Sequence, residues 1–228
     1  MTRLSLELQR LFPSTPADGR LRRLVLELRA PADWAALGRV WQGVQTDLGW
    51  PAPAIALSGQ DGVQLWFALQ QPVDAAEAGA VLRWLVQRHL AELPAHRLRL
   101  LPGTDGALGW RPGAVPLLQA AGDDGERWSA FVAPDLAPLF SETPWLDVEP
   151  NPEGQASLLA GLRAITAEAW QRAVAVALPV ADPQPLGAAP ATMAAFTDPR
   201  AFLLSVMNDP AVPMALRIDA AKALLPGA

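Results

Sequence analysis

The chain has 228 residues, no cysteine, two histidines and a formal net charge of −5. This composition excludes disulfides, thiolate metal sites and His-rich zinc sites, and the overall charge does not favour binding to nucleic acid. The sequence has no apolar run of membrane-spanning length and no apolar signal segment at its start, so we expect a cytoplasmic protein without membrane contact. The length is sufficient for one large domain or for one domain with appendages.

The charge is distributed unevenly along the chain. Residues 1–111 carry twelve basic and ten acidic side chains, whereas residues 112–228 carry six and thirteen. A local basic face is therefore expected only in the first part of the chain.

Strand and helix patterns alternate over residues 20–101. Residues 24–29 predict a strand with its leucines on one face, and Pro31 opens a helix whose apolar stripe ends at Leu48. Two further strands are predicted at residues 54–57 and 63–70. Asp74 and Glu77 form a capping-box pattern before a second helix. Leu98 and Leu100, flanked by Arg97 and Arg99, predict a fourth strand that ends at Pro102.

This order of strand, helix, strand, strand, helix and strand is typical of ferredoxin-like and RNA-recognition-type folds. We therefore predict an α+β fold with a βαββαβ core and an irregular and helical C-terminal extension. The first strand should lie between the third and fourth strands of an antiparallel sheet, with both helices on one side.

The remaining chain is predicted to be mostly irregular over residues 102–153 and to form one helix over residues 158–178. A Pro- and Ala-rich linker is expected at residues 179–195, after a domain of residues 1–178. Residues 196–228 predict a hairpin of two amphipathic helices, which resembles a helical segment of small phage packaging proteins. This hairpin is a candidate contact for a protein partner.

Residues 58–67, with the sequence SGQDGVQLWF, place a glycine-bearing turn directly before an alternating strand. The run resembles the second motif of archaeo-eukaryotic-type primases and primase-polymerases, in which a Ser-Gly-x-x-Gly-x-His-x-Trp sequence carries a nucleotide-binding His. Gln64 stands at the position of that His. A shorter similarity to plasmid and phage primases lies in residues 125–131. The same turn also fits a simple hairpin that requires a positive φ.

Alternation along the strands places six side chains on the sheet face away from the two predicted helices: Glu27, Arg29, Gln64, Trp66, Arg97 and Arg99. The resemblance implies that this face carries the family's catalytic groups, including an acid pair on the first strand for two metal ions. Glu27 matches the first acid, but Arg29 replaces the second, and Arg99 lies near a later one. The residues equivalent to the family's motifs are Glu27, Ser58, Gly59, Gly62 and Gln64.

The favoured hypothesis is a primase-like binding or assembly protein of phage or plasmid DNA metabolism, without catalytic residues, metal or cofactor. One alternative is an active nucleotidyltransferase that uses rearranged acids, namely Glu27, Asp61 and Asp105. A second alternative is a protein-interaction module without a nucleic-acid role. Weak binding of single-stranded DNA or a nucleotide would use the following candidates: Arg29, Gln64, Trp66, Arg97 and Arg99.

Trp66 has two interpretations on such a face. An open indole could stack on a base, whereas a covered indole would belong to a second core. We favour the second interpretation and expect the C-terminal extension to cover it. Glu27 and Arg29 could equally be solvated or paired with neighbouring residues.

Overall fold

The computed structural model describes residues 1–13, 20–102, 120–121 and 127–178, and a few helical residues between 203 and 224. The chain divides into two units, Met1–Pro179 and Val180–Ala228. In the second unit the Arg217 Nε atom donates to the carbonyl of Met207 at 2.9 Å. The linker predicted at residues 179–195 lies outside the described residues. No helix in the described part of the chain has both the length and the apolar character needed to cross a membrane.

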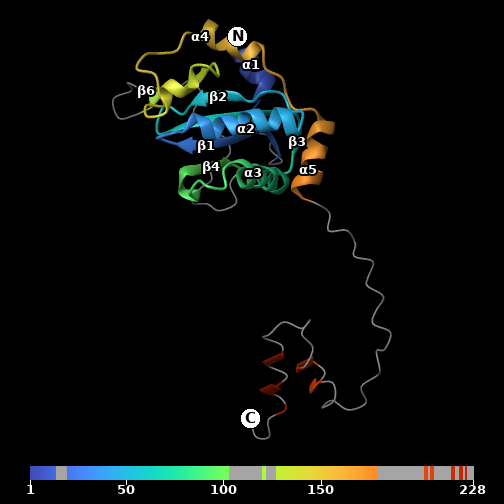
Figure 1. Ribbon diagram of the computed structural model, residues 1–228. Helices are drawn as coiled ribbons and strands as arrows, with labels where there is room; N and C mark the ends of the chain where they lie inside the picture. The colour runs from blue at the N-terminus through green and yellow to red at the C-terminus, as the bar shows by residue number, and fades with distance from the viewer. Residues whose placement is uncertain are drawn as a thin grey trace. The chain divides into compact units, whose positions relative to one another are not determined.

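A five-stranded antiparallel sheet organises the first unit, with the strand order β4-β1-β3-β2-β7 (Figure 1). The strands are β1 (Leu21–Arg29), β2 (Ala54–Leu57), β3 (Gly62–Val73), β4 (Leu98–Leu101) and β7 (Ala130–Val132). The predicted α+β class is confirmed, and β1 lies between β3 and β4 as expected. Two further short strands, β5 (Ala120–Ala121) and β6 (Arg127–Trp128), pair with each other.

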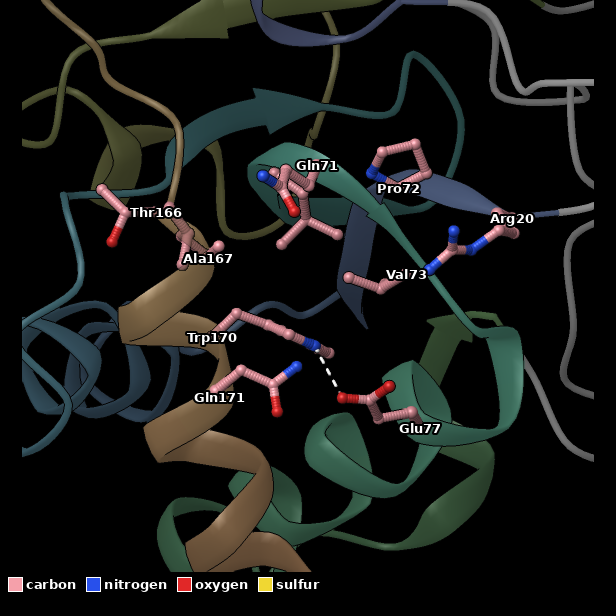
Figure 2. Close-up of a pocket in the computed structure, with 11 residues that line it drawn as sticks. Arg20, Gln71, Pro72, Val73, Glu77, Thr166, Ala167, Trp170 and Gln171 are labelled. Atoms are coloured by element: carbon pink, nitrogen blue, oxygen red, sulfur yellow. Dashed lines mark hydrogen bonds between the residues drawn. The ribbon is translucent and has the colours of Figure 1, made fainter.

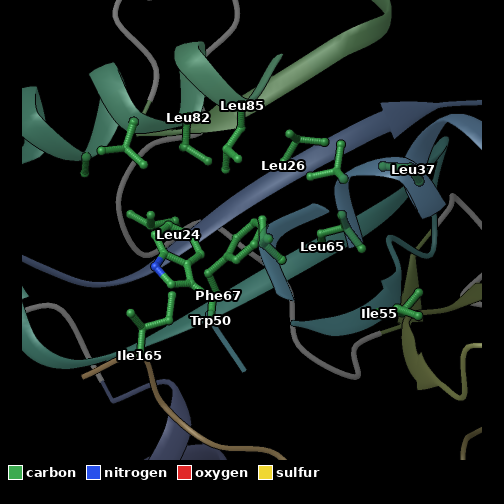
Figure 3. Close-up of a cluster of buried hydrophobic side chains, with 14 of the residues drawn as sticks. Leu24, Leu26, Leu37, Trp50, Ile55, Leu65, Phe67, Leu82, Leu85 and Ile165 are labelled. Carbon is green, nitrogen blue, oxygen red and sulfur yellow. The ribbon is translucent and has the colours of Figure 1, made fainter. Parts of the chain in front are cut away.

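Three helices line one face of the sheet and enclose the main core. They are α2 (Trp34–Asp47), α3 (Ala75–His89) and α5 (Ala167–Ala177). Asp33 caps α2 and Asp74 caps α3, because each carboxylate accepts amide hydrogen bonds from the first turn of its helix. Leu24 and Leu26 of β1 pack against Leu82 and Leu85 of α3 (Figure 3).

The opposite face of the sheet carries a second, smaller core beneath α1 (Arg3–Leu11) and α4 (Pro152–Ala160). Phe12 follows α1, and its ring lies 5.1 Å from Trp66 and 6.0 Å from Phe131 of β7. Leu159 of α4 belongs to the same cluster. The sequence did not predict α1, so the C-terminal extension supplies only part of this cover.

The helix predicted over residues 158–178 is wrong, because the chain forms α4 and α5 with an extended segment between them. In that segment the Ile165 amide donates to the Ala68 carbonyl at 2.8 Å, and the Gln70 amide donates to the Ile165 carbonyl at 2.9 Å. Backbone pairing with β3 thus competes successfully with helix formation.

The region predicted to be irregular supplies the fifth strand, and this also corrects the expectation. Beyond β7, the Gln155 side chain of α4 bonds both backbone groups of Phe131: its Oε1 accepts from the amide at 2.7 Å and its Nε2 donates to the carbonyl at 2.9 Å. Because these two bonds satisfy strand-edge groups, a three-residue strand can end the sheet without a further neighbour there. The described part of this unit also has two short 3-10 helices, at Ala95–Arg97 and Ala137–Phe140.

Candidate functional site

The site begins at the turn between β2 and β3, which the Ser58 hydroxyl organises. Its Oγ accepts hydrogen bonds from the amides of Gln60, Asp61 and Gly62, at 3.1, 3.0 and 2.9 Å. The Ser58 amide in turn donates to the Gly62 carbonyl at 2.9 Å. This side chain therefore closes the turn locally, as serine hydroxyls do in turns.

Steric constraints explain why both positions of the turn, Gly59 and Gly62, are occupied by glycine. Gly59 has φ +75°, and a Cβ atom there would lie 2.8 Å from the amide nitrogen of Ser129. A Cβ atom at Gly62 would lie 2.6 Å from Cγ and 2.7 Å from Cδ of Glu27. The first glycine supplies a backbone conformation that other residues rarely adopt, and the second makes room for a buried acid.

Glu27 is the buried acid at the centre of the site. It has no exposed surface, and its cross-strand neighbours are Gln64 on β3 and Arg99 on β4. Gln64 Nε2 donates to Oε2 of Glu27 at 2.7 Å, and Arg99 Nη1 donates to Oε1 at 3.0 Å. Each carboxylate oxygen therefore has a donor from a different neighbouring strand.

The orientation of Gln64 is set by Trp66, two residues further along β3. The Trp66 indole Nε1 donates to Gln64 Oε1 at 2.7 Å. Because the amide oxygen is occupied by this donor, the amide nitrogen faces Glu27. Trp66, Gln64 and Glu27 thus form a buried chain of hydrogen bonds on one face of the sheet.

Asp61 connects this chain of hydrogen bonds to the protein surface through Arg99. It receives two hydrogen bonds from Arg99, at 3.1 and 3.2 Å, and the Arg29 Nε atom donates to it at 2.9 Å. Arg99 therefore bridges Glu27 and Asp61, and two arginines match two carboxylates. The Asp61 and Arg29 side chains keep 35% and 42% of their surface exposed, so this end of the network meets solvent.

Burial raises the pKa of Glu27 to about 7, and the nearby charge of Asp61 acts in the same direction. The hydrogen bond from Gln64 and the charge of Arg99 oppose this rise, because both stabilise the carboxylate. Glu27 thus changes charge near neutral pH even though it is enclosed.

Of the six side chains predicted on this sheet face, the structure brings five together: Glu27, Arg29, Gln64, Trp66 and Arg99. Arg97 lies in a 3-10 helix instead of on β4, and its Nη2 donates to the backbone carbonyls of Arg29 and Pro31. The prediction that it shares the sheet face with Arg99 is therefore wrong, because β4 begins only at Leu98.

Trp66 is 1% exposed beneath Phe12 and Phe131, and Gln64 is 2% exposed. This corrects the hypothesis that Trp66 stacks on a base, because the cover over the indole leaves no open ring face. Alternation along β3 located Trp66 correctly. The sequence did not reveal that a helix at the start of the chain covers it.

The carboxylates of the site are bound by guanidinium groups, which cannot ligate Mg²⁺ and would repel it. Among the described residues, no group of three or more Asp, Glu or His side chains is arranged to hold a metal ion. Asp105, named in the nucleotidyltransferase alternative, lies outside the described residues. In chemical terms, the arrangement can exchange a proton at Glu27 and present a paired charge cluster to solvent.

A cavity of about 90 Å³ lies on the other side of the sheet, between β3, α3 and α5 (Figure 2). Glu77 and Trp170 face each other across it, and the Trp170 Nε1 atom donates to Glu77 Oε1 at 2.9 Å. The cavity is too small for a nucleotide, since ligand pockets typically exceed about 300 Å³. It is separate from the Glu27 network.

No family model matches the sequence, and no curated protein matches it. One similar solved structure is described as "Polymerase Domain from Mycobacterium tuberculosis Ligase D in complex with DNA". The two chains share 25% identity with a TM-score of 0.28, and the likeness covers 36% of this chain and 32% of that chain. This similarity spans about a third of each protein and carries no argument about function.

Substitution of Gly62 tests the close contact with Glu27. We expect Gly62→Ala to lower the free energy of unfolding by about 1–3 kcal/mol, because the added methyl overlaps the buried acid. Gly161→Ala is the matched control, because a Cβ atom there has no neighbour within 4 Å. Urea denaturation measures both. Equal stability of the two variants would contradict the contact.

The raised pKa of Glu27 also predicts a pH dependence of stability. Between the ordinary pKa of 4.5 and the folded value of about 7, the folded protein binds the proton more tightly than the unfolded chain. The contribution of Glu27 to stability is therefore fully present below pH 4.5 and is lost as pH rises through 7. Each unit of pKa shift corresponds to about 1.4 kcal/mol, so the loss amounts to roughly 3 kcal/mol.

Urea denaturation of Glu27→Gln at pH 5 and pH 8 tests this dependence. The neutral variant should gain stability relative to the wild type as pH rises. The exposed Glu149→Gln variant serves as control and should follow the wild type at both values. A constant difference between Glu27→Gln and the wild type would show that Glu27 does not titrate in this range.

Proposed function

We propose that the protein is a catalytically inactive primase-polymerase-like domain that acts as a binding or assembly protein in phage or plasmid DNA metabolism. The observation that carries this proposal is the engagement of Glu27 by Arg99. The acid equivalent to the family's first metal ligand has no exposed surface and is bound to a guanidinium at 3.0 Å.

Two-metal phosphoryl transfer needs carboxylates whose oxygens are free to bind hard cations. In this chain, Arg29 stands at the position of the second acid and binds Asp61 instead. Asp61, the nearest other carboxylate, is also held by Arg99. A cation would have to displace two arginines, and this argues against the alternative of a rearranged active site.

The same pairing favours a protein partner over single-stranded DNA. Arg29 and Arg99 would bind phosphates only by giving up Asp61 and Glu27, and Trp66 is enclosed beneath α1 and α4. The proposed contact for a protein partner is the segment 196–228, in which the sequence pattern predicts two amphipathic helices.

Primer synthesis and extension with the purified full chain test the absence of catalysis. We expect no product above background with either Mg²⁺ or Mn²⁺ and a complete set of nucleotides. A known active primase-polymerase in the same reactions controls for the assay. Product that is formed by the wild type and by Glu149→Ala but is abolished in Glu27→Ala would overturn the proposal.

Binding of single-stranded DNA is a separate test, measured by fluorescence anisotropy at low and moderate salt. We expect weak binding at low salt and none at physiological salt, since the protein is acidic and Arg29 and Arg99 are paired with acids. Binding at physiological salt that is lost in the Arg97→Ala/Arg99→Ala double variant would favour a DNA-binding role instead.

A further inference from the structure

Arg23 occupies an unusual position on the covered face of the sheet. It lies on β1 opposite Ala68 of β3, on the same face as Val25 and Glu27. The residue is only 8% exposed. Its guanidinium lies 5.8 Å from the centre of the Trp66 ring, which provides a flat apolar surface beneath it.

This guanidinium lacks a counter-charge among the described residues. Its Nε atom is fully enclosed and has no hydrogen-bond partner in this part of the chain. The terminal nitrogens are not among the enclosed unpartnered atoms, and no ion pair within the described ranges includes them. Arg99, on the same face, differs sharply because it bonds two carboxylates.

A buried charge without a partner is costly, and a cation–π contact compensates for only about 1–2 kcal/mol of that cost. Burial lowers the pKa of Arg23, but arginine remains protonated in proteins. The positive charge therefore persists. Of the two ways to satisfy it, hydration and an anion, an anion also neutralises the charge.

The geometry of the guanidinium favours a phosphate group. No acid occurs between residues 20 and 26, so the neighbours of Arg23 along the chain offer it no counter-charge. A guanidinium fork is planar by itself and binds phosphate with two parallel hydrogen bonds, and the Trp66 ring lies against the Arg23 fork.

We propose that Arg23 anchors a binding site for a phosphate group on the Trp66 side of the sheet. The phosphate oxygens accept hydrogen bonds from the terminal nitrogens at the edge of the guanidinium. The Trp66 ring packs against one flat face of the same guanidinium. The site shares Trp66 with the Glu27 network but uses none of its carboxylates or arginines, and it does not depend on the absence of catalysis.

Thermal unfolding of the full chain in phosphate and in chloride, at matched ionic strength, tests the proposal. At about ten times the dissociation constant, phosphate should raise the Tm of the wild type by about 3–5 °C. Arg23→Met should lose this rise. The variant is expected to fold, because replacing a buried unpaired charge by an apolar chain of similar length is often neutral or stabilising.

Arg22→Met is the matched control. It removes the same charge from the adjacent, less buried position of the same strand. It should keep the phosphate-dependent rise, which separates a specific site from the general stabilisation that phosphate gives to many proteins. An equal rise in all three proteins, or no rise in the wild type, would overturn the proposal.

A second measurement keeps the proposal testable even if Arg23→Met fails to fold. In NMR titrations of the wild type with inorganic phosphate, the side-chain signals of Arg23 and the indole signal of Trp66 should shift together and saturate. Their failure to shift would refute the site. Parallel titration with adenosine monophosphate distinguishes the source of the group: tighter binding indicates a phosphate monoester, and equal or weaker binding indicates free phosphate.

Discussion

The enclosed carboxylate of Glu27 is the interaction on which the rest of this face depends. A buried acid is tolerated only when its oxygens are bonded, and each oxygen here has a donor, Gln64 on one side and Arg99 on the other. Gly62 is required because any side chain there would overlap the acid. The turn closed by Ser58 then places Asp61 where it can share Arg99 with Glu27.

The second core follows from the same arrangement. Trp66 fixes Gln64 through its indole nitrogen, and this bond is protected because Phe12 and Phe131 exclude water around the ring. An open sheet face would expose the hydrogen bonds of Trp66, Gln64 and Glu27 to solvent. The helices α1 and α4 therefore do more than bury apolar area, since they maintain the environment that raises the pKa of Glu27.

The parts of the fold that alternation and helical periodicity determine could be predicted from the sequence. The βαββαβ order, the central place of β1 and the shared face of Glu27, Gln64 and Arg99 all follow from local patterns. The fifth strand could not be predicted, because three residues carry too little pattern and their edge is completed by Gln155. The break between α4 and α5 also depends on a distant partner, the backbone of β3.

The residues of the candidate site could largely be predicted from the sequence, but their burial and their hydrogen-bond partners could not. The sequence places Trp66 and Arg29 on one face, yet whether an indole is open or covered depends on segments far away in the chain. The prediction failed for Arg97 because the 3-10 helix ends at Arg97 and β4 begins one residue later, at Leu98. The sequence pattern does not locate this boundary to a single residue. Arg23 was overlooked because the adjacent pair Arg22 and Arg23 gives no signal of which side chain is buried.

Two arginines on one sheet face have different roles: Arg99 stabilises the fold, and Arg23 is proposed to bind a ligand. Arg99 is fully engaged, and its removal would leave Glu27 bound only to a neutral amide inside the protein. Its charge is thus part of the fold, as expected for a guanidinium that bridges two acids. Arg23 is more enclosed than Arg99, but among the described residues it contacts an aromatic ring instead of an acid. A charge that the described part of the fold does not neutralise is the one that a ligand can use.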